Sequence, residues 1–256
     1  MNLEIVGLTC GYGNKNIVEN VSLSVTSGEM VCLFGPNGVG KTTFFKTLLG
    51  LLKQKQGKIL LDGENTEKWS RQDFARKVGY VPQAHIPSFA YRVVDFVVMG
   101  RCAHISNFAT PGKRDKVLAE QALDSLNIAY LRNELYTEIS GGERQMVLIA
   151  RALTQEAPFL IMDEPTANLD FGNQIKVLKK IDDLVKHKNL GVIMTTHSPN
   201  QAFECASKVA AIGTDHTFIV GTPDEVITEE YLKKVYGVNV EICRISKLNK
   251  KVCVPV

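Results

Sequence analysis

Long apolar runs are missing from this sequence of 256 residues. No stretch approaches the ~18 consecutive apolar residues that a membrane-spanning helix needs. The first nine residues carry Glu4 and alternate like a strand, which does not match the pattern of a signal peptide. We therefore expect any contact with a membrane to be peripheral.

Paired cysteines and a strong excess of charge are missing as well. The six cysteines show no CxxC spacing, and Cys10 and Cys32 fall in strand-like apolar surroundings. This pattern predicts reduced thiols in a cytosolic compartment. A formal net charge of +3 is weak for a protein that binds a polyanion, so no nucleic-acid partner is expected.

What is present is typical of a globular α/β domain. Hydrophobic residues make up 45% of the chain and charged residues 22%, close to soluble averages. Strand-like apolar runs alternate with amphipathic helical patterns, which predicts βα units around a largely parallel sheet. The predicted strand and helix pairs are 30–34 with 42–52, 159–162 with 174–187, and 191–196 with 200–206.

The pattern changes between Gln83 and Ile139, where helical spacing dominates in 93–99 and 114–126. We interpret this stretch as an inserted helical subdomain. Beyond Thr222 a short helix at 229–236 precedes two β-rich runs, which predict a terminal hairpin. The predicted organisation is one domain: a nucleotide-binding core of 1–82 and 140–225, a helical subdomain of 83–139, and a C-terminal helix and β-hairpin in 226–256.

A glycine-rich segment, residues 35–42, follows a buried strand and opens a helix, as a phosphate-binding loop requires. The glycines allow successive backbone N–H groups to surround phosphate oxygens, and the helix start adds a favourable dipole. Lys41 supplies a mobile positive charge, and Thr42 offers a hydroxyl to Mg²⁺. The bare pattern also occurs by chance in about one chain per hundred, so the flanking strand and helix carry the interpretation.

Two adjacent carboxylates, Asp163 and Glu164, stand at the carboxyl end of an apolar strand, where open α/β sheets bind ligands. Asp163 is suited to hold Mg²⁺ through water, and Glu164 to deprotonate the water that attacks a γ-phosphate. His197 follows the strand-like run 191–196 and predicts a contact with the same phosphate. Taken alone, the carboxylates are also compatible with a solvated strand end, and the histidine with a packing or surface position.

Ser140, Gly141, Gly142 and Glu143 precede a helix with apolar residues at helical spacing. They form a second helix start that can bind an anion. In isolation these residues are more typical of an ordinary helix cap.

The order of these motifs resembles the ABC ATPase family over essentially the whole chain. The resemblance implies an α/β fold with a P-loop NTPase (RecA-like) core, an inserted helical subdomain and an antiparallel β portion at the N-terminal side. The matching motifs are the Walker A loop at 35–42, Gln83 of the Q-loop, the signature at 139–143, the Walker B strand at 159–164, the D-loop at 167–170 and the switch histidine His197.

The family resemblance implies ATP and Mg²⁺ as cofactors. It implies that Glu164, His197 and Gln83 act in hydrolysis, that Thr42, Gln83 and Asp163 hold the metal, and that Tyr12 stacks on adenine. The remaining implied nucleotide contacts are Gly35, Pro36, Asn37, Gly38, Val39, Gly40, Lys41, Thr43, Ser140, Gly141, Gly142, Glu143 and Asp170.

The implied partners are a second copy of the chain, integral membrane permease subunits and, indirectly, a substrate-binding protein. In the implied homodimer, the signature of one copy faces the Walker A loop of the other across ATP. The implied location is the cytoplasmic side of the cell membrane. The gene neighbour that encodes the membrane subunit would be the most informative guide to cargo.

Three stretches are similar to importer ATPases for iron-siderophore, haem and cobalamin complexes: 93–101, 143–153 and 236–240. Zinc or manganese importers share part of this pattern and remain an alternative. Two departures from the family pattern are mild, with Glu143 in place of the commoner Gln and Ile139 in place of Leu. Two others, Ser198 and Ser207, stand where many relatives carry Asp and bear on the subgroup only.

Two soluble classes share the same ATPase motifs. An ATPase of DNA repair or chromosome organisation needs a long coiled-coil arm, for which 83–139 is too short. A translation-associated ATPase usually joins two cassettes, whereas one is present here.

The membrane-subunit interface is predicted on the loops 84–91 and 101–108, which flank the apolar residues Val93, Val94, Val97 and Val98. The valines are expected mostly to pack the core of the subdomain because of their helical spacing. The loops carry aromatic and basic residues of the kind found at interfaces, namely Phe89, Tyr91, Arg92 and Arg101.

Overall fold

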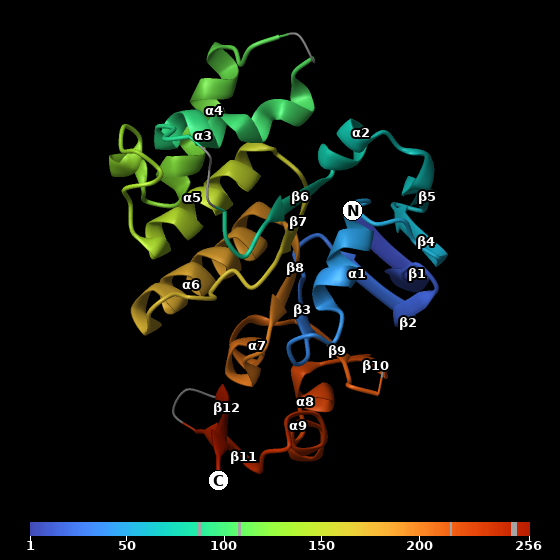
Figure 1. Cartoon of the computed structure of the whole chain (residues 1–256). Helices are drawn as coiled ribbons and strands as arrows, with labels where there is room; N and C mark the ends of the chain where they lie inside the picture. Colours follow the sequence, from blue (N-terminus) through green and yellow to red (C-terminus); the bar gives the residue numbers. More distant parts are fainter. Residues whose placement is uncertain (86–88, 107–108, 216, 247–249) are drawn as a thin grey trace. The chain divides into compact units, whose positions relative to one another are not determined.

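The structure is a computed structural model that describes residues 1–85, 89–106, 109–215, 217–246 and 250–256 (Figure 1). The chain forms two compact units. The first combines Met1–Lys68 with Asn189–Val256, and the second is Trp69–Lys188. Each unit is described by itself.

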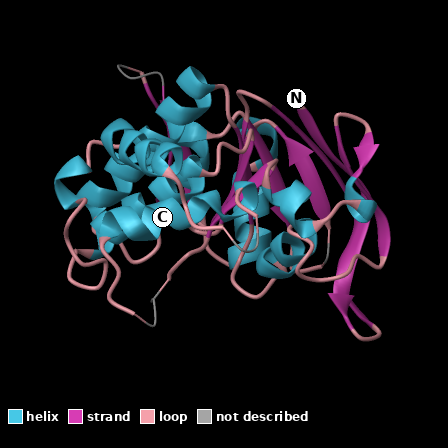
Figure 2. Ribbon diagram, turned by 90° about the horizontal axis from the view of Figure 1, so that it is seen from above, coloured by secondary structure: helices cyan, strands magenta, loops and turns pink. Residues whose placement is uncertain are grey.

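The first unit opens with an antiparallel sheet in the order β2-β1-β4-β5, drawn in magenta beside the N-terminus in Figure 2. Its strands are β1 (Asn2–Tyr12), β2 (Lys15–Thr26), β4 (Gln56–Leu61) and β5 (Glu64–Asn65), and a 3-10 turn η1 (Thr66–Lys68) follows. Burial along β2 alternates between its two faces, as expected for a sheet covered on one side. This sheet confirms the predicted antiparallel portion at the N-terminal side.

The same unit contains parallel strands that carry the glycine-rich loop. β3 (Met30–Phe34) pairs in parallel with β8 (Gly191–Thr196) on one side and β9 (Lys208–Ile212) on the other, and β10 (Phe218–Gly221) extends the sheet antiparallel to β9. Every residue of β3 and β8 is buried. The bounds of both strands agree with the sequence prediction, because continuous apolar runs mark strands that are covered on both faces.

The helices of this unit differ from the prediction mainly at their ends. α1 (Lys41–Leu48) stops four residues before the expected Leu52, because Gly50 takes a φ of +68°. The N–H groups of Leu51 and Leu52 both turn back to the carbonyl of Lys46, at 2.8 and 3.0 Å. α7 (Pro199–Cys205) follows β8 as predicted, one residue earlier at each end.

The C-terminal part contains α8 (Pro223–Val226) and α9 (Glu229–Tyr236), then an antiparallel pair of strands, β11 (Val240–Ile245) and β12 (Lys250–Pro255). The predicted helix and hairpin are thus confirmed. Two hydrogen bonds fix the hairpin to α7: the amide group of Asn200 donates to the carbonyl of Cys253 at 3.2 Å and accepts from its N–H at 2.7 Å.

The second unit pairs two parallel strands with a group of helices. β6 (Val78–Val81) lies beside β7 (Phe159–Met162) in register, and α2 (Arg71–Ala75) precedes β6. The remaining helical elements are α3 (Val93–Val98), η2 (Met99–His104), α4 (Lys113–Ser125), η3 (Ala129–Leu131), α5 (Gly141–Thr154) and α6 (Phe171–Lys188). Helix α6 begins three residues before the predicted Gln174, because Asp170 caps it: its carboxylate accepts the Asn173 N–H at 2.9 Å.

The helical part of this unit has its own aromatic core. Phe96 and Tyr136 are almost fully buried and stack with ring centroids 4.3 Å apart. The guanidinium of Arg151 lies over the Phe96 ring, 4.8 Å from its centroid. As predicted, three of the four valines that flank the proposed interface loops are buried, namely Val93, Val97 and Val98.

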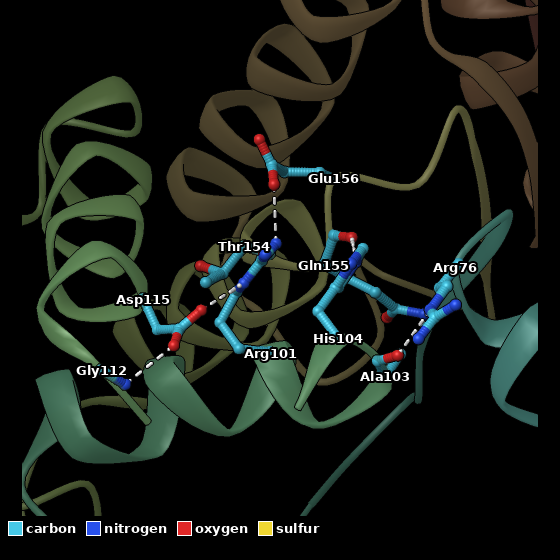
Figure 3. A network of polar contacts seen from close by, with 9 residues as sticks. All are labelled: Arg76, Arg101, Ala103, His104, Gly112, Asp115, Thr154, Gln155 and Glu156. Atoms are coloured by element: carbon cyan, nitrogen blue, oxygen red, sulfur yellow. Dashed lines mark hydrogen bonds and ion pairs between the residues drawn. The ribbon is translucent and has the colours of Figure 1, made fainter. Parts of the chain in front are cut away.

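Arg101 does not lie on an exposed docking loop, so the prediction for this residue was wrong. It is 5% exposed and forms ion pairs with Asp115 at 3.0 Å and Glu156 at 2.7 Å (Figure 3). Its guanidinium also donates to the carbonyl of Thr154 at 2.9 Å. Because these partners come from α4 and the end of α5, local sequence gave no sign of them.

Cys10 and Cys32 are buried and reduced, and Cys102 is exposed. Burial raises the pKa of the Cys10 thiol. Among the described helices, not one is both long enough and apolar enough to pass through a bilayer.

Candidate active site

The glycine-rich loop of the first unit connects β3 to α1. Its backbone requires glycine, because Gly38 and Gly40 take φ values of +81° and +117°. A Cβ on Gly40 would lie 2.7 Å from a methyl group of Val18. The loop therefore turns its backbone sharply into the start of α1, the arrangement that exposes N–H groups to an anion.

Lys41, at the first position of α1, folds back over this loop. Its ammonium group donates to the carbonyls of Gly35 at 2.8 Å and Pro36 at 2.9 Å, and the residue is only 6% exposed. The neighbouring Thr42 is exposed, so its hydroxyl is accessible, whereas Thr43 is buried. A positive charge, a helix start and an accessible hydroxyl thus lie within two residues of each other.

His197 lies at the same edge of the parallel sheet as the loop. Phe34, the last residue of β3, is paired with Thr196, the last residue of β8. Gly35 follows Phe34 in the chain, and His197 follows Thr196. His197 is exposed, which leaves its ring accessible to a ligand at this edge. The structure thus brings two of the predicted motifs together within one unit.

Tyr12 ends β1 and is 50% exposed, directly opposite Lys15 across the β1–β2 turn. The strand that follows this turn contacts the loop, since Ile17 and Val18 lie against Gly40. Tyr12 is therefore an exposed ring at the end of the hairpin whose second strand touches the glycine-rich loop.

The second unit brings the predicted acidic residues together with Gln83. Val81 and Met162 are paired at the carboxyl ends of β6 and β7. Just beyond them, the amide nitrogen of Gln83 donates to a carboxylate oxygen of Glu164 at 3.2 Å. The sequence placed both residues at strand ends but could not establish this bond, because it depends on the pairing of strands 81 residues apart in the chain.

Asp163 and Glu164 face different surroundings. Asp163 is 8% exposed, and its N–H donates to the carbonyl of Val81 at 2.9 Å. Burial and the negative charge of Asp163 raise the pKa of Tyr80. Glu164 takes a φ of +42°, a left-handed conformation that costs a non-glycine residue about 1 kcal/mol and is concentrated at functional sites.

Ser140 is the N-cap of α5 and forms a reciprocal pair with Glu143. The Ser140 hydroxyl accepts the Glu143 N–H at 3.3 Å, and the Glu143 carboxylate accepts the Ser140 N–H at 2.9 Å. Hydrogen bonds to the carboxylate from the Ser140 hydroxyl, then the Ser140 N–H, and to a smaller degree Tyr130 lower the pKa of Glu143. Gly142 has no room for a side chain, since a Cβ would lie 2.8 Å from the Asn173 side chain on α6.

Two residues beside these motifs escaped the sequence analysis. Tyr130 donates a hydrogen bond to Glu143 at 2.9 Å, and Asn173 bonds to Asp170 through its side chain at 2.7 Å. A capping pattern is visible for Asp170 and Asn173, which stand three residues apart. Tyr130 lies in a short 3-10 turn without periodicity, and its contact leaves no local signal.

The family model for ABC transporters matches residues 18–167, which span the glycine-rich loop, Gln83, the signature and the acidic pair. The chain belongs to the ABC transporter family. As a member of this family it is an ATP-binding, ATP-hydrolysing subunit of a transporter, with an ABC ATPase fold.

Relatives in this family align over nearly the whole chain. An uncharacterized ABC transporter ATP-binding protein of Haemophilus influenzae is 43% identical over 94% of this chain and 92% of its own length. A molybdate import ATP-binding protein from the same organism is 36% identical, with 91% and 87% covered. An iron(3+)-hydroxamate import ATP-binding protein of Bacillus subtilis is 33% identical, with 96% and 91% covered.

A solved structure agrees with the fold. An inward-facing putative metal-chelate type ABC transporter contains a chain that superimposes with a TM-score of 0.88 at 33% identity. The match covers 99% of this chain and 97% of that one. The predicted ABC ATPase architecture is thereby confirmed.

Proposed function

We propose that Glu164 is the general base of ATP hydrolysis in this ABC subunit and that Gln83 orients it. The hydrogen bond of 3.2 Å between the two side chains carries this proposal. Glu164 takes a proton from water, the water oxygen bonds to the γ-phosphorus, and the bond from that phosphorus to the β-phosphate oxygen breaks. ADP and inorganic phosphate leave, and the proton passes from Glu164 to solvent.

The glycine-rich loop, residues 35–43, binds the triphosphate in this proposal. Lys41 neutralises the β- and γ-phosphates, His197 contacts the γ-phosphate from the neighbouring strand end, and Tyr12 stacks on adenine. The position of His197 beside Gly35 in the strand register supports its role.

The chemistry of the proposed metal ligands fits Mg²⁺. This ion prefers oxygen ligands and keeps several waters, and Thr42, Gln83 and Asp163 can each offer an oxygen. Gln83 donates to Glu164 through its nitrogen, which leaves its carbonyl oxygen to act as a ligand. When bound, the metal would neutralise charge on the β- and γ-phosphates.

The start of α5 has a role in the proposed homodimer. We propose that Ser140, Gly141, Gly142 and Glu143 of one copy bind the γ-phosphate held by the loop of the other copy, with Asp170 near the same nucleotide. The cap geometry at Ser140 supports this, because the Glu143 N–H holds the hydroxyl oxygen at the helix start. The hydroxyl proton, which bonds to the Glu143 carboxylate, can turn to an incoming phosphate oxygen.

The proposed partners beyond the second copy are permease subunits at the cytoplasmic side of the membrane, which residues 83–139 would contact. Core residues 1–82 and 140–225 would bind nucleotide, and 226–256 would form an accessory C-terminal part. The cargo we propose is a metal chelate of the iron-siderophore, haem or cobalamin type, supported by relatives named for iron(3+)-hydroxamate and hemin import. The molybdate import relative makes an oxyanion the competing cargo.

The test of the site is Glu164→Gln. This variant should bind ATP normally and hydrolyse it about 10²- to 10⁴-fold more slowly, which is the usual contribution of a positioned base. Glu120→Gln, on the exposed face of α4, is the matched control and should hydrolyse ATP at the normal rate. Normal turnover by Glu164→Gln would place the base elsewhere.

The test of the pair uses the same variant. Glu164→Gln should be monomeric without nucleotide and dimeric with ATP in sedimentation velocity, and Ser140→Arg should abolish this shift while single chains still bind ATP. Loss of ATP binding by the single chain would mean that Ser140 acts within its own copy.

The test of cargo reconstitutes the chain with its permease in proteoliposomes. Binding protein loaded with a ferric hydroxamate should stimulate ATPase activity in proteoliposomes. Stimulation by molybdate-loaded protein alone would replace the metal-chelate assignment.

A further inference from the structure

Tyr130 holds the Glu143 side chain from outside helix α5. Its hydroxyl donates to one carboxylate oxygen of Glu143 at 2.9 Å, and the N–H of Ser140 donates to the other, also at 2.9 Å. Each oxygen of the carboxylate therefore accepts one bond from a different element. Hydrogen bonds to an ionised acceptor are about twice as strong as neutral ones.

The position of Tyr130 is fixed although its ring is 67% exposed. It lies in η3, between Ile128 and Leu131, which are 5% and 3% exposed. The N–H of Leu131 donates to the carbonyl of Ile128 at 3.0 Å, which closes the turn. The two buried neighbours hold the turn in place, so the backbone from which the phenol reaches Glu143 is fixed.

The effect of this contact reaches Ser140. The Glu143 carboxylate fixes the backbone of Ser140 through its N–H, and the Glu143 N–H fixes the Ser140 hydroxyl oxygen at 3.3 Å. A hydroxyl whose oxygen accepts from the helix still carries one donor proton, and here the Ser140 proton bonds to the Glu143 carboxylate. The position of that carboxylate thus sets the direction from which the Ser140 proton can turn to a phosphate oxygen.

We propose that Tyr130 is a positioning residue for the second phosphate site: through Glu143 it sets the orientation in which Ser140 binds the γ-phosphate of the partner copy's ATP. This inference rests on the proposed function of the ATP-dependent pair. This arrangement depends on a glutamate at position 143, because a carboxylate can accept hydrogen bonds from Tyr130 and Ser140 at the same time. A glutamine amide accepts through one atom only, so its bond to Tyr130 would have to reverse direction and lose the charge.

The test measures dimerisation of the Glu164→Gln chain against ATP concentration. Adding Tyr130→Phe keeps the ring and removes the hydrogen bond, and it should raise the ATP concentration at half-dimerisation about threefold to tenfold. ATP binding by the single chain and the melting temperature should not change, because the lost group is at the surface. Tyr231→Phe, a half-buried tyrosine of α9, is the matched control and should leave the midpoint unchanged.

A double-mutant cycle tests whether Tyr130 acts through Glu143 and Ser140. The effect of Tyr130→Phe should shrink in the Glu143→Gln background and vanish in the Ser140→Ala background. An unchanged midpoint in Tyr130→Phe would overturn the inference, and so would an effect that persists without the Ser140 hydroxyl. Failure of the parent Glu164→Gln chain to dimerise would refute the proposed pair itself, so the two failures are distinguishable.

Discussion

Lys41 carries its positive charge inside a loop of backbone carbonyls, where its ammonium group bonds to the carbonyls of Gly35 and Pro36. An ammonium group held at a low exposed fraction is already partly desolvated. Phosphate oxygens can therefore replace the two carbonyls as hydrogen-bond partners of the ammonium group.

Lys41→Ala should abolish ATP turnover and weaken ATP binding, because Lys41 is the cation that we propose for the β- and γ-phosphates. Equilibrium binding of a fluorescent ATP analogue and a phosphate-release assay measure the two effects. The control is Lys46→Ala, an exposed lysine of the same helix, which should behave like the parent. Parent-level activity in Lys41→Ala would remove this residue from the site.

Most residues of the candidate site could be proposed from the sequence, because their chemistry is tied to local patterns. The glycines and Lys41 stand next to each other, and the acidic pair ends an apolar strand. Tyr130 and the Gln83–Glu164 bond could not be predicted, since each needs the packing of distant segments. Arg101 was misjudged for the same reason: its acidic partners lie 14 and 55 residues away.

At the scale of elements, strands were easier to place than helix ends. The bounds of β3, β7 and β8 follow from continuous apolar runs, which burial on both faces enforces. Helix ends depend on single residues, such as Gly50 after α1 and Asp170 before α6. Apolar periodicity carries no information on such caps.

The ion-pair network of Arg101 joins three helical elements of the second unit (Figure 3). Arg101→Met should lower the free energy of unfolding by about 2 kcal/mol, because it leaves the buried carbonyl of Thr154 without its donor. Urea unfolding followed by circular dichroism measures the change. Arg71→Met, at an exposed position, should cost under about 0.5 kcal/mol. An equally small loss for Arg101→Met would show that the network does not stabilise the unit.

The same network should contribute to acid sensitivity. The N–H of Gly112, followed by Arg101, lowers the pKa of Asp115. A carboxyl whose folded pKa is depressed stabilises the fold fully above its unfolded pKa of about 3.9, and this contribution disappears as pH falls through the folded value. Asp115→Asn should therefore flatten the loss of stability between pH 5 and pH 2, measured by urea midpoints at each pH. A parallel shift at every pH, with the slope unchanged, would contradict this linkage.

At the scale of the whole molecule, the open question is which surface meets the permease. With Arg101 buried, the predicted loops retain Phe89, which is 67% exposed, and Tyr91, whose ring meets that of Phe89 edge-on at 6.1 Å. Ser106 in the second loop is exposed, whereas Ser88 and Phe108 lie outside the described residues. Because this aromatic pair is suited to an interface, we still predict that these loops contact the permease.

Single cysteines at positions 88 and 106 should crosslink to cytoplasmic loops of the permease in membranes. The background needs replacement of Cys102, Cys205, Cys243 and Cys253 only, because Cys10 and Cys32 are buried. Ser246→Cys, exposed in the C-terminal part, is the control and should not crosslink. Crosslinking at 246 alone would move the interface to the tail. Mass spectrometry of the adducts identifies the partner loop.

The left-handed backbone conformation of Glu164 lowers the stability of the fold at the position of the proposed catalytic base. Glycine adopts a φ of +42° without steric cost, so Glu164→Gly should be slightly more stable than the parent although it lacks the proposed base. Laboratory evolution that selects only for heat resistance or expression would therefore tend to discard the proposed base. An engineered thermostable form of this chain should be chosen by turnover as well as by melting temperature.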